Sequence, residues 1–208
     1  MTLPKDPKKI RDRITRYEKT LKSRNHRDGS GLRFLLGPLY LLVGDAEGAE
    51  KSYAWYKRKF PDDMPEAFNH LCWVLTLLRT EKENQAKTKF RELVFSNLYS
   101  VPLLLKEPTQ QHSFRHSSNW EYLSYITDGP CEEIFSLFDA SELEWIRSEW
   151  RSKSIQDDVV RFIEIHKLLD SEARGIERSR LVDEAYRIAT GRSLDLFDDN
   201  DNVISPFK

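Results

Sequence analysis

Apolar residues recur at intervals of three and four along most of this chain, which is the spacing of one face of an α-helix. The alternating pattern of a half-buried strand is almost absent. Helices are therefore expected at about residues 8–22, 32–43, 46–59, 64–79, 85–97, 120–126, 134–138, 141–150, 154–169 and 176–190. The pattern predicts an all-α protein.

Short polar turns connect the helices expected between residues 32 and 97. Gly44 and Asp45 separate the first pair, since glycine accepts the left-handed conformation that ends a helix and aspartate caps the next one. Residues 80–84 separate the second pair. Short connections make consecutive helices pack as antiparallel neighbours, so two helical hairpins are predicted here. Farther along, Ser141 and Glu144 have the spacing of a capping box at a helix start.

The first hairpin carries the residue spacing of a tetratricopeptide repeat. The matching positions are Leu36, Gly37, Tyr40, Ala49, Tyr53 and Pro61. Gly37 and Ala49 are small enough to let two helices approach closely, and Tyr40 and Tyr53 would fill the space beside them. Ala86 and Phe90 repeat Ala49 and Tyr53 at a distance of 37 residues, slightly longer than the usual period of about 34.

Two residues depart from that repeat pattern. Tyr56 stands where a small residue is usual, and Pro38 lies inside the expected first helix, where it removes a backbone hydrogen bond. The chain therefore matches the tetratricopeptide pattern only in part, and we call it tetratricopeptide-like.

Four longer segments extend the comparison to a particular family: residues 28–45, 99–105, 117–123 and 140–146. The first reads DGSGLRFLLGPLYLLVGD, and the second reads YSVPLLL. Together they resemble the suppression-of-tumorigenicity-seven-like family of tetratricopeptide proteins over about residues 25–150. The resemblance implies a helical-repeat scaffold without a known catalytic residue set.

This pattern and resemblance predict an α-α superhelix of tetratricopeptide-like hairpins with helical caps at both ends. Residues 1–150 are expected to form an N-terminal helix and a repeat domain. Residues 151–208 are expected to form a C-terminal helical extension packed on that domain, ending in an acidic tail.

The charge balance, the cysteines and the apolar runs of the chain bear on its expected partners and cellular location. Lysine and arginine total 33 against 34 acidic residues, so the net charge of −1 gives no general attraction to nucleic acid or an anionic membrane. Cys72 and Cys131 lie among apolar neighbours and are expected to be buried thiols. The start of the chain has no signal-peptide pattern, and its longest apolar run is too short to cross a bilayer. We expect a cytoplasmic protein.

The sequence offers only weak evidence for catalytic or metal-binding residues. His112 and His116 have ligand spacing only if their polar segment is helical. The acidic run 198–202 lacks the glycine and glutamate positions of a calcium loop. Residues 29–31 could present backbone N–H groups to an anion at a helix entry. Nucleophile, Walker and dinucleotide motifs are missing. We expect no enzyme activity, cofactor or metal.

The expected function is binding of a protein or peptide through the concave side of the hairpins. Helix positions not needed for the core would line this groove: Arg33, Asn69, Trp73 and Thr76. Trp55 and Trp73 either contribute to the groove or pack against the flanking helices. The alternative from a different class is a nucleic-acid-associated regulator that uses the basic N-terminal helix. Its basic stretch runs from Lys5 to Arg24, with His26 and Arg27 beyond it.

Overall fold

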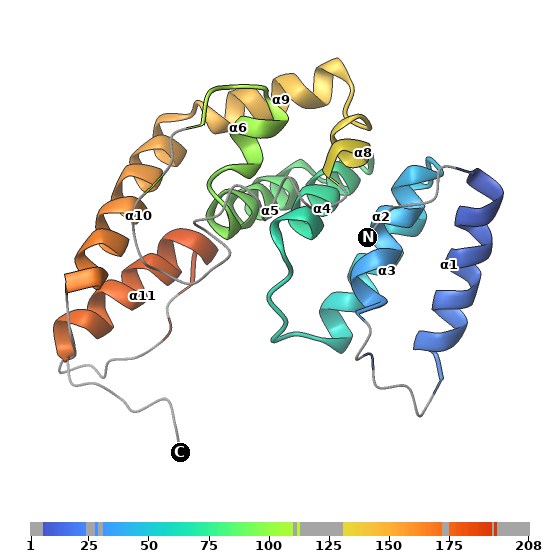
Figure 1. The fold of residues 1–208 in the computed structure, drawn as a ribbon, viewed down its shortest axis with the longest axis horizontal. Coiled ribbons are helices and arrows are strands. Elements are labelled where there is room, and N and C mark those ends of the chain that lie inside the picture. Colours follow the sequence, from blue (N-terminus) through green and yellow to red (C-terminus); the bar gives the residue numbers. More distant parts are fainter. Residues whose placement is uncertain are drawn as a thin grey trace. The chain divides into compact units, whose positions relative to one another are not determined.

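The computed structural model describes residues 6–23, 28, 31–109, 112, 131–171, 175–192 and 194. Within these ranges the regular elements are all α-helices, and no strand occurs (Figure 1). The prediction of an all-α protein is therefore confirmed. The helices are α1 (Pro7–Leu21), α2 (Arg33–Leu42), α3 (Ala46–Lys59), α4 (Ala67–Arg79), α5 (Glu83–Ser96), α6 (Ser100–Leu104), α8 (Cys131–Phe135), α9 (Ala140–Trp150), α10 (Lys153–Ser171) and α11 (Ile176–Thr190).

The chain divides into two compact units. The N-terminal unit comprises Met1–Phe90 and Ser124–Trp145, and the C-terminal unit comprises Arg91–Leu123 and Ile146–Lys208. The sequence predicted a single boundary at residue 150. The two units instead meet at two points in the chain, one inside α5 and one inside α9.

In the N-terminal unit, α1 packs against α2, α2 against α3, and both α2 and α3 against α4 (Figure 1). Asp6 begins α1 by accepting a hydrogen bond from the Lys8 backbone N–H at 2.8 Å, and Pro7 supplies the fixed φ of a first helical residue. The buried face of α1 carries Ile10 and Ile14, which join Leu36 and Leu39 in one apolar cluster together with neighbouring residues.

A polar contact adds to this apolar one. The Tyr40 hydroxyl on α2 donates a hydrogen bond to the Glu18 carboxylate on α1 at 2.7 Å. This bond lowers the pKa of Glu18, because it stabilises the charged form of the carboxyl group. Glu18 thus faces the protein, while most of the other charged residues of α1 face solvent.

Helices α2 and α3 approach each other closely where glycines face tyrosine rings. A Cβ atom on Gly37 would lie 2.3 Å from the Tyr53 ring. The predicted role of Gly37 in close helix packing is confirmed, and Ala49 is fully buried as expected. A second such contact was not predicted: a Cβ atom on Gly48 of α3 would lie 2.5 Å from the Tyr40 ring of α2. A glycine on each helix therefore packs against a tyrosine ring of the other helix.

Both hairpins make their turns with the same backbone motif, at equivalent positions. After α2, the N–H of Gly44 bonds to the Leu41 carbonyl, and the N–H of Asp45 bonds to the Tyr40 carbonyl. After α4, the N–H of Glu81 bonds to the Leu78 carbonyl, and the N–H of Lys82 bonds to the Leu77 carbonyl. Both are Schellman motifs, whose first residue beyond the cap adopts a left-handed conformation. Gly44 has φ +75°, whereas the non-glycine Glu81 is held at φ 57°.

Replacing Glu81 by glycine is expected to raise the free energy of unfolding by about 1 kcal/mol, because glycine adopts positive φ without the Cβ penalty. Glu81→Ala is the matched control, since it removes the same carboxylate but keeps a Cβ at that φ. Chemical denaturation of both variants measures the difference. Equal stability of the glycine and alanine variants would contradict strain at this turn.

The C-terminal unit is built around helices α10 and α11, which pack side by side (Figure 1). The Phe95 and Phe162 rings lie 5.0 Å apart in its core. Arg161 forms a two-pronged ion pair with Glu184, with N–O distances of 2.7 and 2.8 Å, and so links α10 to α11. Arg91 reaches α10 as well, because its guanidinium donates to Asp158 at 2.6 Å.

Three predicted helix starts were wrong. Helix α8 begins at Cys131 and not at Ile134. Helix α4 begins at Ala67 and not at Met64, since Pro65 disfavours the helical conformation of the residue before it. The predicted capping box of Ser141 and Glu144 lies two residues too late. The Asp139 side chain accepts from the Glu142 N–H at 2.8 Å, and the Glu142 carboxylate accepts from the Asp139 N–H at 2.9 Å.

Among the helices of the described ranges, none combines the length and the apolar composition that a membrane-spanning segment requires.

Candidate functional site

Three of the four residues predicted to line a groove are buried. Trp73 is 7% exposed, Asn69 4% and Thr76 0%. The Trp73 ring stacks on Tyr53 with a centroid distance of 4.7 Å, and the Lys89 ammonium lies 4.1 Å from its centroid. The prediction that these side chains face an open groove was wrong, because α4 is buried on almost all sides and their positions serve the core.

The fourth residue, Arg33, is half-buried and bound within the protein. Its guanidinium pairs with Asp63 at 2.6 Å and with Asp28 at 3.0 Å, and it lies over the rings of Phe34 and Phe60. These contacts use both the charge and the flat face of the guanidinium. Arg33 therefore stabilises the start of α2 and the turn after α3, and does not offer a free cation to a partner.

The helix entry at residues 29–31, considered above as an anion site, already has an anionic group. The Asp28 carboxylate accepts hydrogen bonds from the backbone N–H groups of Leu32 and Arg33 at 2.8 and 3.0 Å. Residues 29 and 30 themselves lie outside the described residues. The chain's own aspartate thus occupies the position that an external anion would take.

The structure describes some of the other candidate residues, and these lie in packed surroundings or apart from one another. Cys72 is a buried thiol, as predicted, whereas the side chain of Cys131 lies outside the described residues. His112 stacks on Tyr99 at a centroid distance of 5.8 Å, and burial lowers its pKa. His116 and the acidic run 198–202 are also outside the described residues. Trp55 is half-buried and packs edge-on against Phe60 at 5.7 Å. The described residues contain no group of three or more histidine, cysteine or carboxylate side chains placed to bind a metal ion.

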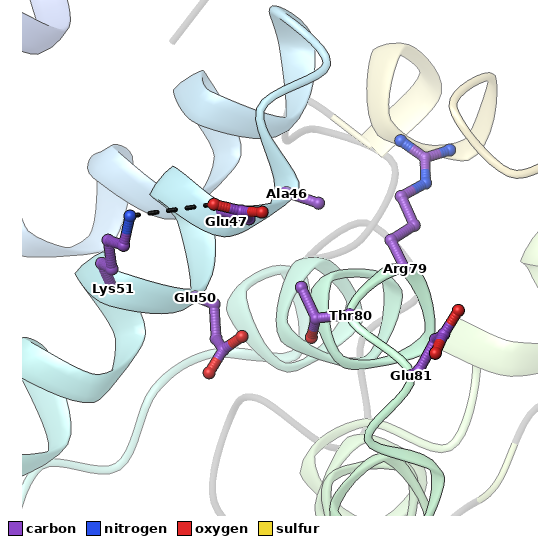
Figure 2. Close-up of a pocket in the computed structure, with 7 residues that line it drawn as sticks. All are labelled: Ala46, Glu47, Glu50, Lys51, Arg79, Thr80 and Glu81. Atoms are coloured by element: carbon purple, nitrogen blue, oxygen red, sulfur yellow. Dashed lines mark ion pairs between the residues drawn. The ribbon is translucent and has the colours of Figure 1, made fainter.

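A hollow of about 390 Å³ lies in the N-terminal unit where α3 begins and α4 ends. Figure 2 shows the residues that line it: Ala46, Glu47, Glu50, Lys51, Arg79, Thr80 and Glu81. The two Schellman turns position these residues. The turn after α2 leads into the start of α3, and the turn after α4 contains Glu81. The lining therefore comes from equivalent ends of the two hairpins.

The cations of this hollow are held by the protein itself. Arg79 is turned away from Glu81 in Figure 2, and its Nε atom pairs with Glu142 at 2.8 Å. The Lys51 ammonium lies 3.9 Å from the Glu47 carboxylate on the same helix. Lys82, just outside the lining, pairs with Glu50. Glu81 forms no ion pair with any residue that the structure describes, so the hollow presents an unneutralised carboxylate.

A second hollow of about 270 Å³ shares Glu81 with the first. Its other lining residues are Leu78, Glu83 and Trp145. The Trp145 ring meets Phe90 edge-on at 5.8 Å and remains partly exposed. We call the two adjoining hollows together the Glu81 surface. It combines carboxylates with a partly exposed tryptophan and a leucine.

Sequence reasoning did not predict the Glu81 surface. Trp145 was placed correctly on a helix, but nothing in its sequence neighbourhood relates it to the turn at residues 80–84. The one available signal was the glutamate at a position equivalent to Gly44, where glycine is usual after a helix. A non-glycine residue at such a strained backbone position points to a possible functional site.

Chemically, the Glu81 surface is suited to binding. Carboxylates, a threonine hydroxyl and an indole can hold a cationic side chain and an adjacent apolar one. The lining residues include no histidine, cysteine or serine that would serve as a nucleophile or as a base near neutral pH.

Comparisons with protein-family models, with curated proteins and with solved structures find no match to this chain.

Proposed function

We propose that this chain is a non-catalytic helical-repeat protein that binds a protein partner through the Glu81 surface. The observation that carries the proposal is the pairing of two hollows around one carboxylate without an ion-pair partner among the described residues. Interfaces are anchored by aromatic residues in partly enclosed sites, and Trp145 lies in such a site. The partner would place a lysine or arginine near Glu81 and an apolar side chain near Trp145.

The proposed architecture is a tetratricopeptide-like superhelix. Three features support it at the same offset along the chain: Ala49 and Ala86 are both buried, Tyr53 and Phe90 are both buried, and Gly44 and Glu81 occupy the same turn position. The second hairpin carries Val74 where the first has Gly37. Membership of the suppression-of-tumorigenicity-seven-like family remains part of this proposal, and it rests on the sequence segments given above.

Glu81→Lys tests the binding surface, since it reverses the carboxylate shared by both hollows. Asp62→Lys is the matched control, because Asp62 is exposed in the turn after α3 and the change in charge is the same. The whole 208-residue chain and both variants are immobilised, and retained host proteins are quantified by mass spectrometry. A retained protein is then purified, and its affinity is measured by calorimetry.

We expect the control to bind like the wild type and Glu81→Lys to lose at least tenfold in affinity, because reversal replaces an attractive charge contact with a repulsive one. Trp145→Ala should lose affinity by a similar factor if the indole is an anchor. Equal binding by all variants, with unfolding curves showing that each is folded, would refute the Glu81 surface as the binding site.

A further inference from the structure

Helix α1 presents an array of unpaired cations to solvent. Lys8, Lys9, Arg11, Arg13, Arg16 and Lys19 form no ion pair with any residue in the described ranges. Lys22 pairs with Glu18 at 3.2 Å. The six unpaired cations lie within twelve residues, Lys8 to Lys19, which corresponds to about 17 Å of helix. Six positive charges over that length give α1 a strong local field in a chain whose net charge is close to zero.

The orientation of α1 is set by its packing, so this array cannot turn inward. Ile10 and Ile14 are 2% and 6% exposed, and Glu18 is held by Tyr40. At 3.6 residues per turn, Lys8 and Lys19 lie opposite that buried face, while Arg11 and Arg13 lie on its two flanks. The cations therefore cover a broad arc of the helix, and Asp12 is the acidic residue near the middle of it.

We propose that this face of α1 binds the phosphate backbone of nucleic acid without reading its sequence. Apart from Pro7 at its start, the exposed residues of α1 are charged or small and polar, with no large apolar or aromatic anchor of the kind that protein interfaces use. Interfaces with nucleic acid are instead polar and strongly positive. This activity goes beyond partner binding at the Glu81 surface and does not depend on it.

The same geometry disfavours an anionic membrane. Amphipathic helices bind membranes by inserting their apolar face, but that face of α1 packs on α2. A flat anionic surface would also meet Asp12 at the centre of the exposed arc. A phosphate backbone, which curves past a helix and carries one charge per about 1.7 Å of duplex axis, can contact the cations on both flanks.

The test measures binding of the full chain to a fluorescently labelled DNA duplex of mixed sequence and to the matching RNA duplex, over a range of salt concentrations. The neutralised variant combines Lys8→Gln, Arg16→Gln and Lys19→Gln. The charge-retaining variant combines Lys8→Arg, Arg16→Lys and Lys19→Arg. The matched control combines Lys106→Gln, Lys153→Gln and Lys167→Gln, which removes three exposed lysines of the C-terminal unit.

We expect wild type, charge-retaining variant and control to bind alike, with affinity falling steeply as salt rises. The neutralised variant should bind at least about tenfold more weakly at low salt, and its salt slope should be smaller by about 3, or about one per lost phosphate contact. Circular dichroism checks that α1 remains helical. The neutralised variant retaining wild-type affinity and slope would overturn the proposal.

Two competitors separate this proposal from other anionic partners. Binding to polyglutamate at least as tight as to the duplexes would assign the α1 face to acidic protein and overturn the proposal. Equal binding to vesicles containing anionic lipid would overturn it in favour of a membrane surface. A clear preference for either nucleic acid over both competitors, lost in the neutralised variant, would support it.

Discussion

Replacing Gly37 by alanine is expected to lower the free energy of unfolding by about 2 kcal/mol. The new Cβ atom would lie 2.3 Å from the Tyr53 ring, far inside van der Waals contact. Overpacking in a core costs typically about 1–3 kcal/mol and occasionally more, while alanine gains up to about 1 kcal/mol over glycine inside a helix. Here the clash should outweigh that gain, because the Tyr53 ring is buried and stacked on Trp73 and so cannot move aside.

A double-mutant cycle separates the clash from other effects of the substitution. Tyr53→Leu shortens the side chain that meets position 37, at its own cost in lost packing. In that background Gly37→Ala should cost far less, giving a favourable coupling of about 1–3 kcal/mol. Thermal and chemical unfolding of the four proteins measure it. An increase in stability of Gly37→Ala alone would show that α2 and α3 are not closely packed here.

Acidification is expected to destabilise the N-terminal unit through His70 of α4. Burial, together with the positive charge of Lys89, lowers the pKa of His70 to about 3, from a usual value of 6.5. Between these values the unfolded chain binds a proton that the folded protein does not. Stability from His70 is therefore complete above pH 6.5 and is lost as the pH falls toward 3.

At about pH 5 this difference corresponds to a loss of about 2 kcal/mol relative to neutral pH, since one pKa unit is worth about 1.4 kcal/mol. Other groups also titrate, so the measured quantity is the difference between wild type and His70→Leu. The variant lacks the titrating ring and should lose less stability between pH 7 and pH 5. Parallel pH profiles for the two proteins would rule out a buried neutral His70.

The helical class and most helix positions follow from the sequence because they depend on local properties. Apolar spacing identified α2 and α3, and a glycine followed by a capping aspartate marked the turn between them. The contact of Gly37 with Tyr53 was also predictable, since the repeat pattern specifies a small residue and an aromatic at fixed separations.

Other features depend on long-range contacts that no local pattern encodes. Trp73 was expected in a groove, but α4 is surrounded by its neighbours, and the ring is held between Tyr53 and Lys89. Whether a helical residue faces solvent depends on how many elements pack around its helix. Periodicity predicts one apolar face, and α4 is buried on nearly all of its faces.

Ionic contacts show most clearly the difference between what local sequence determines and what tertiary contacts decide. The sequence alone established that α1 is basic and amphipathic, and hence which of its faces would be buried. Only the tertiary structure decided that Glu18 bonds to Tyr40, that Arg33 and Arg79 are bound to distant carboxylates, and that Glu81 is not. The physical reason is that local spacing determines helix faces, whereas the pairing of charges depends on segments that folding brings together from distant parts of the chain.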